Sequence, residues 1–319
     1  MTPSTEARAA SGDGRQDDTG VDTVTGAFSY SGRAIAAELT ARGRRVRTLT
    51  AHPQRAVDTA IEATPLDFDD PRGLAASLEG TTTLFNTYWV RFAHGTTTHE
   101  RAVDNTKTLF AAAKQAGVSK IVHVSILHPS SSSPYPYFRG KALCERALAE
   151  SGVASAVLRP SVLFDEHGVL LNNIAWLLRR LPVFAVGGRG DYRVRPIHVA
   201  DLASLAVDAA GWTEDRTVDA VGPERPTFNE LVGEIRAAVQ SRAAIVHVPG
   251  PALVLGSRVL GLALRDVLLT RDEYASMAGG LADSTAPATG ATSLSTWLGE
   301  HADELGRTYA SELDRHFRS

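Results

Sequence analysis

The chain has 319 residues, a net charge of −3 and an apolar fraction of 43%. These values are typical of a globular protein with one large domain or two small ones, and they exclude a fibrous or wholly disordered chain. The net negative charge gives no general attraction to nucleic acid, so no nucleic-acid partner is expected. A single cysteine, Cys144, excludes an internal disulfide and a cysteine-based zinc site. We therefore expect a reducing, cytoplasmic location.

Residues 1–20 are small and polar and lack an apolar segment, so they are interpreted as a flexible tail rather than a secretion signal. Two later apolar stretches, Val169 to Val186 and Pro251 to Leu269, are each interrupted by two arginines. Neither is expected to span a bilayer. The second is interpreted as a buried amphipathic helix, with a peripheral membrane contact or a subunit contact as the alternatives.

The segment from Val24 to Gly32 reads VTGAFSYSG and joins a short strand-like run to a helix. Such a strand, turn and helix start directs backbone N–H groups and the positive end of a helix dipole at one spot, which favours a phosphate. Gly26 and Gly32 stand where the chain approaches itself closely, and Ser29 takes the place of a third glycine. An ordinary turn between a strand and a helix is the alternative.

From residue 21 to about 160, short β-branched runs alternate with longer helical patterns. This alternation predicts an α/β fold with a doubly wound parallel sheet, whose ligands gather at the carboxyl ends of the strands. The expected strands after the glycine turn are 45–50, 65–68, 82–85, 120–125 and 155–159, and the expected helices are 54–63, 71–78, 99–116 and 138–151.

Glycine and proline become frequent after Pro160, around residues 182–190. We expect residues 21–160 to form the nucleotide-binding domain and 161–319 a smaller mixed substrate lobe, with about 195–225 returning to the sheet. No internal repeat is found.

Tyr137 and Lys141 are four residues apart, which places them on one face of a helix. A nearby cation stabilises a phenolate, so a lysine can make a tyrosine a usable proton donor or acceptor. With seven tyrosines and four lysines in the chain, the chance expectation for this spacing is about 0.09. Ser125, at the end of the strand before them, could hold a substrate oxygen beside the phenol.

The glycine turn, Ser125 after the fifth strand and Tyr137-x-x-x-Lys141 together resemble the short-chain dehydrogenase/reductase superfamily. The similarity is to its extended or atypical branch, which includes epimerase/dehydratase-like, NmrA-like and complex I accessory subunit-like proteins. Further similar segments cover nearly everything after residue 20, namely 86–92, 158–160, 196–203, 294–298 and 305–313.

The resemblance implies a Rossmann fold with a dinucleotide across the strand ends. It implies catalytic roles for Ser125, Tyr137 and Lys141, with Lys141 also holding the nicotinamide ribose. It places the remaining cofactor contacts at three points: Gly26, Phe28, Ser29, Tyr30 and Gly32 under the pyrophosphate, Asp67 and Phe68 at the adenine, and Asn86, Thr87 and Tyr88 beside the ribose and nicotinamide. Ser29 departs from the pattern, so either its hydroxyl donates to a phosphate or binding is weaker.

The choice between NAD and NADP follows from charge. An NAD site places an acid near the end of the second strand, where this chain has Thr50, Ala51 and His52. Arg33 could attract a 2′-phosphate, so NADP is preferred over NAD; a solvated Arg33 is the alternative.

Other residues carry weaker indications. The histidines show no metal-ligand spacing, so no metal is expected. Asp201, after His198, is expected to cap a helix. Arg193 and Arg195 could clamp an anionic substrate, with solvated or core-rim arginines as the more frequent alternative. Four aromatic side chains could line an apolar pocket or pack in the core: Trp89, Phe92, Trp176 and Tyr192.

Two functions are compatible with these residues. The first is an NAD(P)-dependent oxidoreductase or epimerase-like enzyme that moves a hydride between nicotinamide and a carbonyl or alcohol carbon, with Tyr137 transferring the proton. The second is a non-catalytic NAD(P)H-binding redox sensor or accessory subunit. A small-molecule substrate is expected, and a sugar nucleotide, a quinone and a small ketone are equally compatible.

Overall fold

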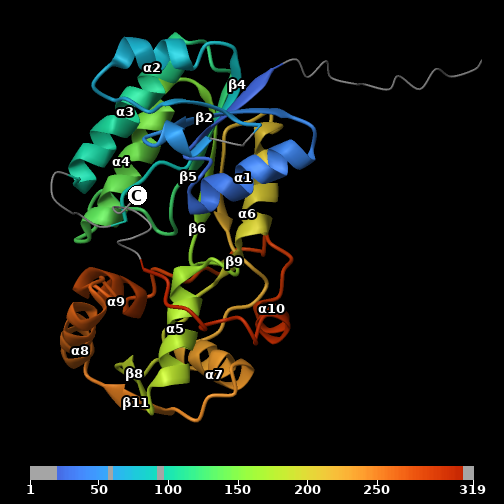
Figure 1. Cartoon of the computed structure of the whole chain (residues 1–319). Coiled ribbons are helices and arrows are strands. Elements are labelled where there is room, and N and C mark those ends of the chain that lie inside the picture. The colour runs from blue at the N-terminus through green and yellow to red at the C-terminus, as the bar shows by residue number, and fades with distance from the viewer. Residues whose placement is uncertain (1–19, 57–59, 92–96, 312–319) are drawn as a thin grey trace, which may run out of the picture.

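A computed structural model describes residues 20–56, 60–91 and 97–311, and within them the main feature is a parallel sheet of seven strands (Figure 1). This confirms the predicted doubly wound α/β fold. The strands of the sheet are β1 (Val21–Thr25), β2 (Arg45–Thr50), β3 (Glu62–Pro65), β4 (Thr81–Asn86), β5 (Lys120–Val124), β6 (Ala154–Pro160) and β10 (Arg216–Ala220).

The strand order is β10, β6, β5, β4, β1, β2, β3. The chain therefore leaves β1 in one direction, through β2 and β3, and then returns to the other side of β1 with β4. In open parallel sheets such a reversal creates a crevice at the carboxyl ends of the strands. The glycine turn follows β1 and so lies at this reversal.

Two hydrophobic layers cover the sheet, because successive strand residues point to opposite faces. Ile121 faces one layer and Val122 the other. One face is covered by α1 (Tyr30–Ala41) and α6 (Val199–Ala210), and the other by α2 (Pro71–Ser77), α3 (His99–Gln115) and α4 (Pro136–Ser151). The strands are accordingly buried on both sides, as the apolar and threonine-rich β4 illustrates.

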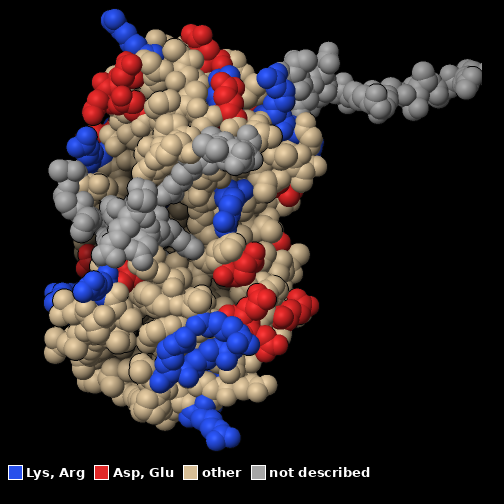
Figure 2. Space-filling model, viewed as in Figure 1, with Lys and Arg blue, Asp and Glu red and all other residues tan. Residues whose placement is uncertain are grey.

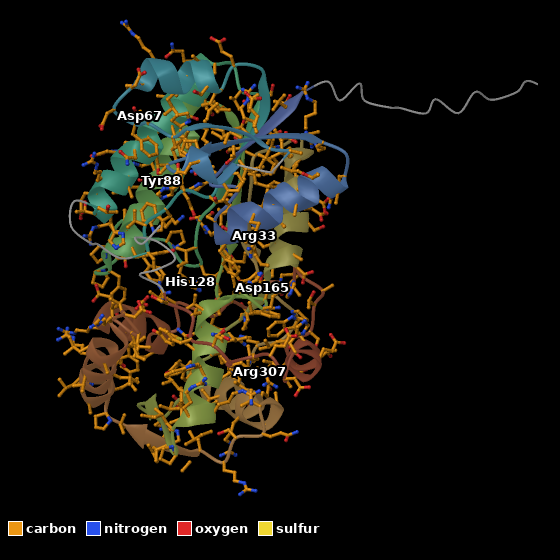
Figure 3. The ribbon with its side chains drawn as sticks, viewed as in Figure 1. Arg33, Asp67, Tyr88, His128, Asp165 and Arg307 are labelled. Atoms are coloured by element: carbon orange, nitrogen blue, oxygen red, sulfur yellow. The ribbon has the colours of Figure 1, made fainter. Side chains whose placement is uncertain are left out.

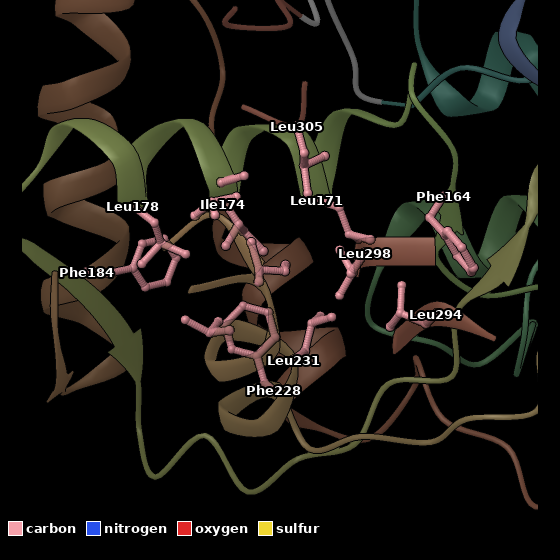
Figure 4. Packing of buried hydrophobic residues seen from close by; sticks show 14 of the residues in the cluster. Phe164, Leu171, Ile174, Leu178, Phe184, Phe228, Leu231, Leu294, Leu298 and Leu305 are labelled. Atoms are coloured by element: carbon pink, nitrogen blue, oxygen red, sulfur yellow. The ribbon is translucent and has the colours of Figure 1, made fainter. Parts of the chain in front are cut away.

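A second lobe has its own hydrophobic core, shown in Figure 4. It contains Phe164, Leu171, Phe228 and Leu298, all buried. The elements of this half are β7 (Leu163–Phe164), α5 (Val169–Arg180), β8 (Val183–Gly187), β9 (Ile197–His198), α7 (Phe228–Ala238), β11 (Ala244–Val248), α8 (Gly250–Leu264), α9 (Arg271–Ala278) and α10 (Leu294–Glu300).

The chain returns from this lobe to the main sheet between residues 199 and 220. Helix α6 packs on α1, and β10 pairs in parallel with β6 from Arg216 opposite Ala156 to Ala220 opposite Pro160. The lobe is thus connected to the sheet more than once, which fixes it beside the strand ends.

Two predicted elements were wrong. Of the expected helix 54–63, only the short 3-10 helix η1 (Pro53–Ala56) forms; residues 57–59 lie outside the described part, and β3 occupies 62–65 instead of 65–68. The edge of β2 offers backbone partners to this segment, and Pro65 is tolerated because it ends an edge strand. The interpretation of 251–269 as a buried helix was also wrong, because α8 exposes Leu255, Val259 and Leu262.

Candidate functional site

The glycine turn is closed by several hydrogen bonds. Gly26 has a φ of +68°, which favours glycine, and its N–H donates to the carbonyl of Leu49 at 2.7 Å. A Cβ on Gly32 would lie 2.2 Å from the Gly26 carbonyl oxygen, so only glycine lets α1 start this close to the turn. Ser29 donates its hydroxyl to the same oxygen at 2.6 Å. Its side chain therefore stabilises the turn from within.

A cleft of about 960 Å³ opens at the carboxyl ends of β1, β2 and β4. The first residues of α1 line it, so the positive end of that helix faces the cleft. Among the expected cofactor-binding residues, those in its wall are Gly26, Phe28, Ser29, Tyr30, Arg33, Thr50, His52, Phe68, Thr87 and Tyr88. Figure 3 labels Arg33 near the middle of the molecule, at the start of α1.

Four expected cofactor-binding residues do not line the cleft. Gly32 lies behind the turn, and Asp67 accepts a hydrogen bond from the N–H of Asp69 in an exposed turn. Asn86 is fully buried, where its Oδ1 accepts from the Thr25 hydroxyl at 3.2 Å. Its role is thus to hold the ends of β1 and β4 together, directly beneath the cleft. The fourth is Lys141.

Lys141 and Tyr137 lie behind the indole of Trp89. Lys141 is 2% exposed, its Nζ lies 4.7 Å from the centre of the Trp89 ring, and it donates to the carbonyl of Val124 at 2.7 Å. The rings of Tyr137 and Trp89 meet edge to face, with centroids 5.7 Å apart. Trp89 itself lines the cleft. The indole therefore contacts both side chains and lines the cleft, whereas neither Tyr137 nor Lys141 lines it.

Burial shifts the pKa values of these two groups in opposite directions. It lowers the pKa of Lys141 to about 8 and raises the pKa of Tyr137 to about 12, because each loses solvation of its charged form. No hydrogen bond joins the two side chains in the described part of the chain. At neutral pH Tyr137 is a protonated phenol and Lys141 an ammonium.

Ser125 is directed toward α4. Its hydroxyl donates to Glu145 Oε1 at 2.5 Å, and the same carboxylate accepts two bonds from Arg159. Glu145 lies one helical turn beyond Lys141, on the side away from Tyr137. The structure therefore brings Ser125, Tyr137 and Lys141 to neighbouring positions at the end of β5 and the start of α4, but occupies the hydroxyl of Ser125 with an ion pair.

Residues of the second lobe complete the rim of the cleft. Tyr30 donates its hydroxyl to Asp165 at 2.7 Å, and His167, two residues further on, lines the cleft. Figure 3 shows Asp165 near the junction of the two halves, below Arg33. No sequence motif indicated this pair, because its residues are 135 positions apart.

A second contact between the halves lies beside Trp89. Arg91 lines the cleft and donates to Glu273 at 2.9 Å. The carboxylate of Glu273 also accepts from the N–H of Thr270, as part of the capping box that begins α9. The capping box fixes Glu273, and Glu273 in turn fixes the loop that carries Trp89.

The structure shows what the residues with weaker indications contact. Arg195 is buried and donates to the carbonyls of Gly222, Ser284 and Ala286, so it holds the backbone of the lobe rather than a substrate. Arg193 donates to the carbonyl of Arg225. The cap of α6 is His198, whose Nδ1 accepts from Ala200 N–H.

Asp201, expected as that cap, accepts instead from two backbone N–H groups at 291 and 292. Of the four aromatic residues considered for a pocket, Trp89 lines the cleft, and Phe92 lies outside the described residues. Trp176 packs on Tyr309 and Tyr192 stacks on Phe228, both in the second lobe. Tyr192 packs against the core of that lobe, whereas Trp176 is partly exposed and lies under Arg180.

The described ranges contain neither a metal-binding cluster nor a membrane-spanning helix. Residues 20–56, 60–91 and 97–311 contain no group of three His, Cys, Asp or Glu side chains placed to hold a metal ion. Across those same ranges, no helix has both the length and the apolar character needed to cross a membrane.

Comparison with known proteins places this geometry in context. NADH dehydrogenase (ubiquinone) 1 alpha subcomplex subunit 9, mitochondrial, of Arabidopsis thaliana is 24% identical over 72% of this chain, which spans 61% of that protein. Quinone oxidoreductase 2 of Escherichia coli is 24% identical over 82% of this chain and 90% of its own length. The structure of Citrobacter sp. triphenylmethane reductase superposes with a TM-score of 0.75 at 17% identity, over 89% of this chain and 99% of that one, which shows a common fold.

A family model described as NAD(P)H-binding matches residues 26–210, from the glycine turn to the end of α6. This range covers more than half of the chain and includes most of the cleft wall. The match and the shared fold agree with the superfamily branch that the motifs resemble. The chain belongs to the NAD(P)H-binding family.

Proposed function

We propose that the protein is an NAD(P)H-dependent oxidoreductase that transfers a hydride from the bound nicotinamide to a carbonyl or quinone substrate. The observation that carries this proposal is the cleft at the strand reversal. The glycine turn and the first residues of α1 line this cleft, and the turn closes this tightly because a Cβ on Gly32 would meet the Gly26 carbonyl. When bound, the dinucleotide supplies the hydride, and the protein supplies orientation and protons. The names of the quinone oxidoreductase and the triphenylmethane reductase support a reductive role.

NADP is the preferred cofactor in this proposal. Arg33 lies in the cleft wall next to the glycine turn, within the same wall as Thr50 and His52 at the end of β2. No acid stands at residues 50–52 to repel a 2′-phosphate. The guanidinium of Arg33 supplies a planar set of donors that suits a phosphate. Phe68 and Tyr88, whose rings are 4.8 Å apart, form an aromatic part of the same wall, which would pack against the bound dinucleotide.

Tyr137 donates the proton in this mechanism. A phenol with a pKa of about 12 is protonated at neutral pH, so it can donate to an oxygen that gains negative charge during reduction. The reverse step, abstraction of a proton from an alcohol, needs a phenolate that burial disfavours. The raised pKa therefore keeps the phenol protonated before the transfer. Lys141, charged at neutral pH, stabilises the phenolate that is left after the transfer.

Trp89 has to move aside for this chemistry. Its indole contacts both Tyr137 and Lys141 and lines the cleft, which neither of them does. We therefore include in the proposal that dinucleotide binding displaces the indole, and that Ser125 rotates from Glu145 to hold the substrate oxygen. With the indole displaced, Lys141 would also hold the nicotinamide ribose.

The test is NADPH oxidation by the purified full-length chain with a panel of quinones and ketones. We expect Tyr137→Phe to lower kcat by about 100-fold or more while the Kd of NADPH, measured by calorimetry, changes less than about threefold. Tyr135→Phe, two residues upstream, is the matched control and should leave both quantities unchanged. Equal turnover in Tyr137→Phe and the unchanged chain would exclude Tyr137 as the proton donor.

A second candidate function is NAD(P)H binding without turnover. It is favoured by the three engaged side chains: Ser125 bound to Glu145, Lys141 bound to the Val124 carbonyl, and Tyr137 covered by Trp89. Its signature is NADPH binding that quenches tryptophan fluorescence, with no oxidation of NADPH by any substrate in the panel. If neither NADPH nor NADH binds at millimolar concentration, both candidate functions fail.

A further inference from the structure

Helix α8 presents an apolar face to solvent. Leu255 and Val259 are each 63% exposed and Leu262 is 80% exposed, the largest exposures among the large hydrophobic side chains of the described residues. Isolated exposed leucines are common, but a continuous exposed stripe indicates an interaction surface. We call these three residues the α8 stripe.

The spacing places the α8 stripe on one side of the helix. The three residues follow one another at i, i+4 and i+7, and the small exposed residues Ala252, Gly256 and Ala263 widen the same apolar face. Arg258 and Arg265 each follow a leucine of the stripe by three positions, so both arginines lie along one flank of it. Both are exposed.

The opposite side of α8 is fixed to the lobe. Val254 and Gly261 are buried, and a Cβ on Gly250 would lie 2.3 Å from the ring of Tyr274 in α9. The helix also packs against β8. Because these contacts already hold the inner side, the α8 stripe is available without unfolding of the lobe.

We propose that the α8 stripe docks on the surface of an anionic lipid bilayer. The helix has 15 residues, too few to cross the hydrocarbon core; it carries Arg258, is followed by Arg265 as its C-cap, and has no carboxylate. An apolar face flanked by arginines lies in the headgroup region with its side chains in the acyl boundary. In Figure 2 the visible surface over α8 is largely uncharged, as expected for the apolar part of this face.

A second copy of the chain fits this surface less well. In a symmetric dimer the same patch contacts itself, so Arg258 and Arg265 would approach the same flank of the other α8. No carboxylate on α8 would compensate them. Lipid phosphates supply the missing negative charge, which is why the bilayer is the occupant we propose.

The first experiment measures co-sedimentation of the full chain with phosphatidylglycerol vesicles and with phosphatidylcholine vesicles. We expect binding to the anionic vesicles that weakens with salt, and loss of binding in the triple variant Leu255→Ser, Val259→Ser, Leu262→Ser. Arg258→Gln with Arg265→Gln should weaken binding by about 25-fold, at about fivefold for each arginine. Arg72→Gln on α2, also an exposed arginine, is the control and should bind unchanged.

The second experiment tests whether α8 itself enters the bilayer surface. The native Cys144 is fully buried, so Leu262→Cys can be labelled selectively with an environment-sensitive dye, and Arg72→Cys serves as the control. We expect anionic vesicles to shift the emission of the dye to shorter wavelength when it is attached at position 262, and not when it is attached at position 72. Three results would overturn the proposal: no binding to anionic vesicles, equal binding by the triple serine variant, or a concentration-dependent dimer in vesicle-free buffer that the triple variant abolishes. Each result is independent of whether NADPH binds or turns over.

Discussion

Replacement of Lys141 by methionine tests whether the ammonium lies in a dry site behind Trp89. The side chain is 2% exposed, with one protein acceptor at Val124 and the Trp89 ring on its other side. Methionine has a similar length and no charge. The variant therefore removes the buried charge while keeping most of the packing.

The expected magnitude follows from the pKa of Lys141. The gap between 10.5 for an exposed lysine and about 8 in the fold corresponds to about 3 kcal/mol of folding free energy. Below pH 8 the group is charged in both states and this cost is complete. Between pH 8 and 10.5 the folded state alone loses its proton, so the cost shrinks, and above pH 10.5 it vanishes. Loss of the bond to Val124 subtracts about 1–3 kcal/mol from the benefit of Lys141→Met at every pH.

The assay is urea unfolding of the unchanged chain and Lys141→Met, followed by circular dichroism at pH 7, 8, 9 and 10. The quantity of interest is the difference between the two free energies of unfolding. We expect the variant to lose about 2–3 kcal/mol of relative stability from pH 7 to pH 10, because the unchanged chain gains it. A difference that stays constant with pH would show that the ammonium is solvated, and the reasoning about the Trp89 cover would be refuted.

Three further predictions concern the cleft and the lobe. Gly32→Ala should destabilise the fold by about 1–3 kcal/mol and raise the Kd of NADPH at least about tenfold, because the new Cβ meets the Gly26 carbonyl. Urea unfolding and calorimetry measure the two effects. The control for both is Gly233→Ala in α7, where a Cβ meets nothing within 4 Å. Arg33→Gln should weaken NADPH about tenfold and leave NADH unchanged in the same calorimetry, and an equal loss for both cofactors would contradict a 2′-phosphate contact. Arg195→Met should lower the free energy of unfolding by about 3–5 kcal/mol since three backbone carbonyls lose their donor; Arg193→Met, at an exposed side chain, should change it by less than about 1 kcal/mol, and equal effects would refute the assignment.

The fold could be predicted from sequence where the signals are local. The glycine turn needs only neighbouring residues, Gly26 for its positive φ and Gly32 for the close approach, and both positions were identified. The strand and helix alternation likewise depends on short-range patterns. The predicted helix 54–63 was wrong at its C-terminal end because residues 62–65 pair with β2, whose backbone partners are distant in sequence.

The sequence predicts which residues lie near one another at the candidate site, but it does not predict how their side chains are oriented. Tyr137 and Lys141 are neighbours on a helix, so their proximity follows from spacing. The indole that covers them comes from the loop after β4, and the carboxylate that binds Ser125 is shared with Arg159 on another strand. The side-chain orientations of Ser125, Tyr137 and Lys141 depend on contacts with the loop after β4 and with β6. No pattern of neighbouring residues in the sequence predicts these contacts.

The ion pair between Arg91 and Glu273 has a consequence for protein engineering. It makes the orientation of the Trp89 loop a joint property of the nucleotide half and of the helix that follows the α8 stripe. A chimaera that grafts a foreign lobe onto this sheet would inherit the tryptophan but not the carboxylate that aligns it. Such a hybrid needs an acidic residue transplanted to the start of its corresponding helix before its coenzyme pocket can be compared with the parent.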